Sequence, residues 1–291
     1  MIRSGYPLIS RYNRKLAAYI VLLRPFTLLA PLAAGIFGTL LPLKDWGWAQ
    51  FREAVYVGVT LALLQAVGQI VNQASDAELD RLAKPYRPIP RGEVTVEEAM
   101  GIAWLLAIFA MARAFFTSIT FGLLSLTLLF MAVFYNIQPI RVKRYTWPNI
   151  LWNGVARGFI PMIATWSIYG DLNSPTPYLL ATLAFLWVTA LNPTKDFPDM
   201  EYDRRFGIQT LPVKYGVKKA TTIITAILGL WALQLAITIT ITGNHLLILT
   251  LPLTIPAILG LKVKTPLENN LAWQTYYVGL SLHYILAYLG R

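Results

Sequence analysis

The chain of 291 residues has no cysteine, and its histidines are limited to His245 and His283. These absences exclude disulfides, thiolate nucleophiles and cysteine-based metal sites, and they disfavour a histidine-rich transition-metal centre. Charged residues are also scarce, at 13%, which is about half the share of a soluble protein. A soluble enzyme, a disulfide-stabilised scaffold and a nucleic-acid binder are therefore all disfavoured.

Apolar residues dominate instead, at 56% of the chain, and the mean hydropathy is +0.53. This composition predicts an all-α membrane protein with a single integral-membrane domain over residues 1–291. The first dozen residues are polar and basic, so no cleavable signal peptide is expected. A spanning helix needs about 20 apolar residues. Nine segments meet this length: 16–43, 52–75, 96–116, 118–137, 147–169, 176–194, 219–242, 245–262 and 270–290.

The distribution of basic residues tests this layout independently. With nine spans, 19 of the 25 Lys and Arg residues fall in segments on one side and four on the other. Cytoplasmic loops of membrane proteins carry such an excess. The N-terminus and the two long loops, 76–95 and 195–218, are therefore predicted to be cytoplasmic, and the C-terminus external. Loops beside anionic lipid account for most of the net charge of +11 without nucleic acid.

Acidic residues gather in the two long loops, which are predicted to cap one end of the helices. D-A-E-L-D-R at 76–81 and D-M-E-Y-D-R at 199–204 share the pattern D-x-E-x-D-R. The two copies follow the second and the sixth span, four spans apart. Their matching positions are those expected of an internal repeat of a four-helix unit.

Spacing within each cluster predicts a stripe of oxygen ligands. Asn72, Asp76 and Asp80 are four residues apart, so on a continuous helix they lie on one face. Asp199 and Asp203 repeat the spacing, and Asp196 precedes them. Stacked carboxylates repel and require a cation, and oxygen ligands without histidine or cysteine suit Mg²⁺.

A second interpretation treats these acids as solvated loop ends that pair with neighbouring arginines. The repetition of one stripe at two equivalent helix ends argues against it. For Glu78 and Glu201, which lie off the stripes, the solvated interpretation is the better one.

Cations surround both acidic clusters. Lys84 and Arg87 lie in K-P-Y-R-P-I-P-R-G, a loop that its prolines stiffen, and Lys195 precedes the second cluster. Acids that hold Mg²⁺ beside bases that hold anionic oxygens, at a membrane surface, indicate a diphosphate whose tail lies in the lipid. Metal and cations would stabilise such a leaving group.

Two arginines fall inside predicted spans. Arg157 lies near the middle of the fifth span, where an arginine costs about 2.5–3.5 kcal/mol, so it is expected to line the cavity or bind an acceptor. A structural contact between helices is the alternative. Arg24 is close enough to the cytoplasmic side to reach it. The end of the fourth span carries four residues that are positioned to close the cavity: Tyr135, Asn136, Arg141 and Lys143.

These motifs resemble those of the UbiA-type intramembrane prenyltransferases. N-Q-A-S-D-A-E-L-D at 72–80 matches the family pattern N-x-x-x-D-x-x-x-D, and K-D-F-P-D-M-E-Y-D at 195–203 resembles its second aspartate motif. Similar segments are R-P-F-T, K-P-Y-R-P-I-P-R-G, Y-N-I-Q-P-I-R-V-K and G-I-Q-T-L-P-V. The resemblance covers the first seven spans, and the last two carry nothing diagnostic.

The resemblance implies nine helices around a central cavity roofed by the two loops. It implies that five residues ligate Mg²⁺, with support from Asp196: Asn72, Asp76, Asp80, Asp199 and Asp203. It also implies that four cations neutralise a prenyl diphosphate: Arg24, Lys84, Lys143 and Lys195. Ionisation would give an allylic carbocation, which a lipophilic acceptor captures. No protein partner is expected.

The acceptor stays open at this point. Gln73 departs from the aspartate that many members carry, and N-Q resembles the branch that acts on aromatic quinone precursors. K-P-Y-R-P-I-P resembles both the chlorophyll-synthase branch and the archaeal ether-lipid branch, and geranylgeranylglyceryl phosphate is the acceptor in the archaeal branch. A phosphorylated acceptor needs a second anion site, which Arg157 or Arg141 would supply. The rival class is a polytopic transporter, which predicts charges near the middle of the membrane in both halves.

Overall fold

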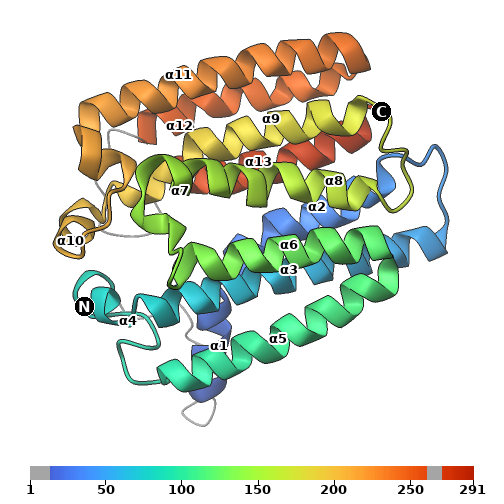
Figure 1. Ribbon diagram of the computed structural model, residues 1–291. Helices are drawn as coiled ribbons and strands as arrows, with labels where there is room; N and C mark the ends of the chain where they lie inside the picture. Colours follow the sequence, from blue (N-terminus) through green and yellow to red (C-terminus); the bar gives the residue numbers. More distant parts are fainter. Residues whose placement is uncertain (1–13, 261–270) are drawn as a thin grey trace.

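The computed structural model of the chain describes residues 14–260 and 271–291, and every regular element in these ranges is a helix (Figure 1). The first half contains α1 (Arg14–Leu23), η2 (Pro25–Leu28), α2 (Leu29–Leu40), α3 (Trp48–Ser75), α4 (Ala77–Ala83), α5 (Val96–Thr117), α6 (Ile119–Asn136) and η3 (Val142–Arg144). The second half contains α7 (Thr146–Asn153), η4 (Gly154–Phe159), α8 (Ile160–Trp166), α9 (Thr176–Leu191), η5 (Asn192–Asp196), α10 (Met200–Arg205), α11 (Leu211–Thr242), η6 (His245–Leu253), α12 (Thr254–Gly260) and α13 (Leu271–Leu289). The all-α prediction is confirmed for these residues.

Within residues 14–260 and 271–291, four helices are long and apolar enough to cross a membrane: α3, α5, α6 and α11. A fifth span results if α1 and the segment Pro25–Leu40, bent by 42°, count as one. The other predicted spans coincide with helices that are shorter or interrupted. Nine spans therefore stay a prediction, although large apolar side chains cover the outer faces of α5 and α11, as in an integral membrane protein.

Three boundaries differ from the predicted segments. The first span breaks at Arg24, whose φ is 54°, because the proline that follows disfavours an α-helical residue before it. The presumed continuous helix through Asp76 is also interrupted, since α3 ends at Ser75 and α4 starts at Ala77. The second long loop is shorter than predicted, because α11 begins at Leu211 and kinks at Gly216.

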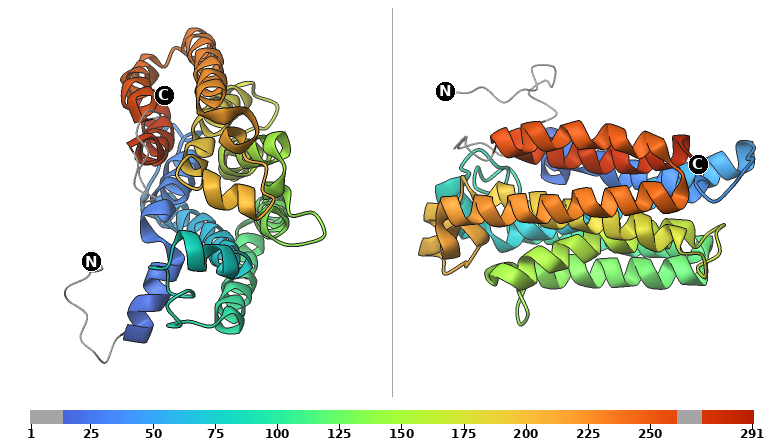
Figure 2. Two further views of the ribbon diagram at one scale, coloured as in Figure 1. Left: turned by 90° about the vertical axis from the view of Figure 1, so that its left-hand side faces the viewer. Right: turned by 90° about the horizontal axis from the view of Figure 1, so that it is seen from above.

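Side chains pack into two clusters within the bundle. The larger one joins α2, α3, α6, α9, α11 and α13 around Trp187 and Trp231, both of which are fully buried. A smaller cluster joins α1, α3 and α5 and reaches Ile89 in the loop after α4. The long helices run side by side, as the two views of Figure 2 also show. This packing holds the ends of α3 and α9 in fixed relative positions.

Both aspartate motifs lie at the same end of the bundle. In Figure 1, α4 and α10 are neighbours at the left, and Lys84 after α4 pairs with Asp199 before α10. The C-terminal Arg291 is at the opposite end, where it donates hydrogen bonds to the carbonyls of Leu40 and Leu43. The predicted cytoplasmic N-terminus, with Arg3 and Arg11, and the basic residues Lys262 and Lys264 lie outside the described residues.

Candidate active site

One cavity brings together the thirteen residues that were predicted to bind metal or substrate. Its lining includes the five aspartates and the eight other predicted residues: Asp76, Asp80, Asp196, Asp199, Asp203, Arg24, Asn72, Lys84, Arg87, Tyr135, Lys143, Arg157 and Lys195. In sequence these residues extend from Arg24, at the break after α1, to Asp203 in the second motif. Arg141, predicted to help close the cavity or to bind an anion, is not among the lining residues and pairs with Asp76 Oδ1 at 3.3 Å. The cavity is polar at the end near α4 and α10, and it is apolar and aromatic farther along the helices.

Asn72 and Asp76 organise the first motif. The helical spacing survives the break, because the Asp76 amide donates to the Asn72 carbonyl at 3.1 Å and the Asp80 amide to the Asp76 carbonyl at 2.7 Å. The Asn72 amide donates to Asp76 Oδ2 at 3.1 Å and to Asn136 Oδ1 at 2.9 Å. Lys143 from η3 donates to Asp76 Oδ1 at 2.6 Å. The first motif is thereby fixed to the end of α6.

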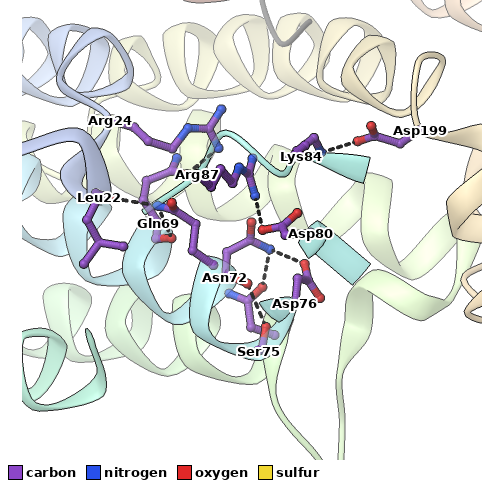
Figure 3. A network of polar contacts seen from close by, with 12 residues as sticks. Leu22, Arg24, Gln69, Asn72, Ser75, Asp76, Asp80, Lys84, Arg87 and Asp199 are labelled. Carbon is purple, nitrogen blue, oxygen red and sulfur yellow. Dashed lines mark hydrogen bonds and ion pairs between the residues drawn. The ribbon is translucent and has the colours of Figure 1, made fainter. Parts of the chain in front are cut away.

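Asp80 occupies the most buried position of the first motif, with 1% of its side chain exposed. Its Oδ2 accepts a hydrogen bond from Arg87 at 2.6 Å, as Figure 3 shows. Its Oδ1 is buried and has no hydrogen-bond partner. A carboxylate oxygen without a partner costs free energy unless a ligand satisfies it.

Asp199, Asp196 and Asp203 take different partners in the second motif. Lys84 donates to Asp199 Oδ2 at 2.5 Å and so links the two motifs across the cavity mouth (Figure 3). Lys195 donates to Asp196 Oδ1 at 2.7 Å, and Asp203 accepts from the Thr210 hydroxyl at 3.3 Å. The spacing within α10 is helical, because the Asp203 amide donates to the Asp199 carbonyl at 2.9 Å. Glu201, like Glu78, is exposed, as the sequence predicted.

Burial and charge shift the carboxyl groups in opposite directions. Burial opposes ionisation of Asp76, but Lys143, Arg141 and Arg87 outweigh it and hold its pKa below the usual value. Burial raises the pKa of Asp80 despite Arg87 and Lys84. For Asp203, burial and the neighbouring carboxylates raise the pKa to about 8. Ionisation of all three carboxyl groups of the second motif is therefore unfavourable unless a further cation binds there.

An Mg²⁺ ion fits the chemistry of this set. The donors are carboxylate and amide oxygens, which hard divalent cations prefer, and Asp80 Oδ1 is a buried oxygen that needs a partner. As the side chains lie, however, no three acidic or histidine groups among the described residues converge to hold an ion. Most of the carboxylates pair with lysine or arginine instead.

The cavity wall also contains residues that were not predicted from the sequence. Five residues of α13 line it, spaced along one helical face: Trp273, Tyr276, Tyr277, Leu280 and Tyr284. No site residue was predicted in the last span, so these side chains add to the predicted set. The periodic aromatic stripe was the available signal. Arg24 NH1 donates to Gln69 Oε1 at 2.9 Å, and its guanidinium lies 5.7 Å from the Trp273 ring.

Comparison with known proteins gives the identity of the fold and the motifs. The UbiA prenyltransferase family matches residues 28–281. The chain belongs to this family. A UbiA homolog from Archaeoglobus fulgidus bound to GPP and Mg²⁺ has a similar structure, with a TM-score of 0.74 and 19% identity over 94% of this chain and 98% of that one. The family prediction from the motifs is confirmed.

Relatives of this UbiA-family chain are named for different reactions. A probable homogentisate phytyltransferase 2 of Oryza sativa is 33% identical over 60% of this chain, and the match spans about half, 48%, of that relative's length. A digeranylgeranylglyceryl phosphate synthase of Methanobrevibacter smithii is 27% identical over 69% of this chain and 70% of its own length. The names leave the acceptor of this UbiA-family chain unassigned.

Gln73 does not line the cavity of this UbiA-family chain, although position 73 differs between branches of the family. Its side chain is 1% exposed and donates to the Leu22 carbonyl at 2.7 Å. The contact satisfies a carbonyl at the end of α1, just before the break at Arg24. Position 73 therefore joins α1 to α3, and its identity says nothing directly about substrate contact.

Proposed function

We propose that this chain transfers a prenyl group from a prenyl diphosphate, such as geranylgeranyl diphosphate, to a lipophilic acceptor in an Mg²⁺-dependent reaction. The observation that carries the proposal is the single cavity in which carboxylates and cations at one end meet an apolar and aromatic wall. A diphosphate needs the first part and a prenyl chain needs the second. Membership of the UbiA family supports the same chemistry.

The proposed roles follow from the donor set. Asn72, Asp76, Asp80, Asp196, Asp199 and Asp203 would hold Mg²⁺, which supplies charge stabilisation for the departing diphosphate. Lys84, Arg87, Lys143 and Lys195 would bind its phosphate oxygens, and Arg24 would assist them. Each of the four cations that pairs with a carboxylate would then exchange that partner for a phosphate oxygen. Departure of the diphosphate leaves an allylic cation, which the aromatic rings of α13 would face.

The same proposal includes the membrane arrangement. Nine spans would surround the cavity, with the loops of the two motifs capping it on the cytoplasmic side and the C-terminus outside the cell membrane. Support comes from the distribution of basic residues and from the position of Arg291 at the end opposite α4 and α10. A transporter, by contrast, calls for matched charges in the middle of both halves. Here the acids of both motifs gather at one end.

Two classes of acceptor fit the proposed reaction. One is an aromatic quinone precursor, and the other is geranylgeranylglyceryl phosphate, a precursor of archaeal ether lipids. Relatives named for each class support both. The cavity residues that distinguish them are those beyond the diphosphate end.

Substitution of Asp76 tests the proposed function. The protein in detergent is incubated with radiolabelled geranylgeranyl diphosphate, Mg²⁺ and each acceptor, and product and released diphosphate are measured. Asp76→Ala should lower turnover at least 100-fold because it removes a metal ligand (on the order of 3 kcal/mol), and chelation of Mg²⁺ should do the same. The matched control is Glu78→Ala, two residues away and exposed, which should keep wild-type turnover. Metal-independent turnover, or equal effects of the two variants, would contradict the proposal.

A further inference from the structure

Arg157 lies in a rare type of helical turn. The predicted fifth span is α7, η4 and α8 in succession, and η4 (Gly154–Phe159) is π-helical. A π-helical turn weakens a helix and occurs frequently at functional sites. At a rise of 1.5 Å per residue, Arg157 lies about 16 Å along the helix axis from Thr146, the first residue of α7. It is therefore deeper in the bundle than the aspartate motifs.

Two glycines fix the other side of this turn against α9. A Cβ at Gly158 would lie 2.6 Å from the Phe185 amide nitrogen, and one at Gly154 would lie 2.3 Å from Thr189 Oγ1. Close packing of this kind holds the backbone of η4 on α9, while the Arg157 side chain lines the cavity. The turn thus presents one cation at a defined place in the cavity wall.

The charge of Arg157 has no acidic partner among the described residues. Its guanidinium donates to the Tyr277 hydroxyl at 3.1 Å and lies beside Tyr276. The Arg24 guanidinium is close enough to repel it. Arg113 of α5 differs: it donates to Thr60 and to the Tyr56 carbonyl and lies outside the cavity lining. An unpaired charge in an apolar interior has a high free-energy cost, so we expect an anion to bind beside Arg157.

Buried tyrosine hydroxyls of the same cavity also need partners. Tyr276 and Tyr284 are each 1% exposed, and neither hydroxyl has a partner at hydrogen-bond distance, although Tyr276 lies close enough to Arg157 to interact with it. Buried hydroxyls are satisfied in nearly all proteins. A ligand with anionic oxygens would accept from Arg157 and from such a hydroxyl together.

We infer that Arg157, with the hydroxyls of Tyr276 and Tyr277, forms a second anion site that holds the ionised group of the acceptor. The inference rests on the proposed prenyl transfer and deepens it, because it makes the acceptor an anionic compound, a carboxylate or a phosphate. The diphosphate has a separate set of cations at the end where Lys84 joins the two motifs. The donor and the acceptor thus use different cations of one cavity.

Paired acceptors test this site. Wild-type protein, Arg157→Gln and the control Arg113→Gln receive geranylgeranyl diphosphate and Mg²⁺ with homogentisate or its methyl ester, and with geranylgeranylglyceryl phosphate or its phosphate-free alcohol. The wild type should use the anionic member of one pair better than its neutral counterpart. A preference within the homogentisate pair indicates a carboxylate site, and a preference within the glyceryl phosphate pair indicates a phosphate site. Arg157→Gln should raise the KM for that anion about 10- to 100-fold, the worth of a charge-assisted contact. It should leave the KM of the donor unchanged.

Controls keep the inference separate from the proposed function. Arg113→Gln should preserve the preference for the anion, and Arg157→Lys should retain part of it. Binding of each acceptor pair to metal-free protein is measured by calorimetry, so the anion site is tested even if no transfer occurs. Equal use of charged and neutral acceptors by the wild type would overturn the inference and leave prenyl transfer standing. A loss of donor affinity in Arg157→Gln with an unchanged preference for the anion would overturn it too.

Discussion

The ion pair between Lys84 and Asp199 is the contact that joins the two aspartate motifs, and its strength can be measured. The Nζ–Oδ2 distance is 2.5 Å, and the side chains are only 12% and 20% exposed. Coulomb's law with an effective dielectric constant of about 20 gives an attraction of about 7 kcal/mol. Desolvation of both groups offsets most of it, and hydrogen bonds between charged groups contribute about 1.5–3 kcal/mol net. We therefore expect a coupling energy of about 2 kcal/mol.

A double-mutant cycle measures this coupling. Lys84→Met, Asp199→Asn and the double variant are compared with the wild type by denaturant unfolding in detergent without Mg²⁺. The control cycle uses Glu201 and Arg205 within α10, whose side chains are 69% and 60% exposed. An exposed pair on a helix should couple by only about 0.3–0.5 kcal/mol. A coupling of Lys84 and Asp199 no larger than that of the control would refute the calculated strength.

Mg²⁺ with an unreactive analogue of the donor should weaken the same coupling. The oxygens of Asp199 that accept from Lys84 are those proposed to ligate the metal, and Lys84 is proposed to bind phosphate. The coupling should fall below about 0.5 kcal/mol, the range of independent sites. An unchanged value in the presence of a saturating analogue would show that Lys84 and Asp199 keep each other as partners when the substrate binds.

Two further predictions concern pH and packing. Burial and two neighbouring carboxylates raise the pKa of Asp203 to about 8, above the ordinary value of 3.8, so folding favours its neutral form. The free energy of unfolding of the metal-free protein should therefore decline between about pH 4 and 8. In denaturation curves, Asp203→Asn should flatten this decline. Equal slopes for both proteins would count against the shift. Gly158→Ala should lower the free energy of unfolding by about 1–3 kcal/mol, because the new Cβ meets the Phe185 amide. The control Gly229→Ala should be neutral or stabilising, because α11 has open space at that position. Similar unfolding midpoints for the two alanine variants would disprove the close packing of η4.

Sequence by itself determined the all-α class, the UbiA family and the charged residues that line the cavity. Each of these depends on a local pattern: apolar stretches of helical length, aspartates four residues apart, and cations beside prolines. Hydrogen bonds from residue to residue keep the four-residue spacing even where α3 stops before Asp76. Local patterns survive folding because the groups that form them are covalently close.

Tertiary structure decided which charges are partners and which are not. Lys84 finds Asp199 far along the chain, Gln73 turns away from the cavity to the Leu22 carbonyl, and α13 contributes its aromatic face. The π-helical turn at Arg157 also depends on the packing of neighbouring helices, which no local pattern reveals. Ion pairing and burial depend on distances across the bundle, and packing of all the helices together sets those distances.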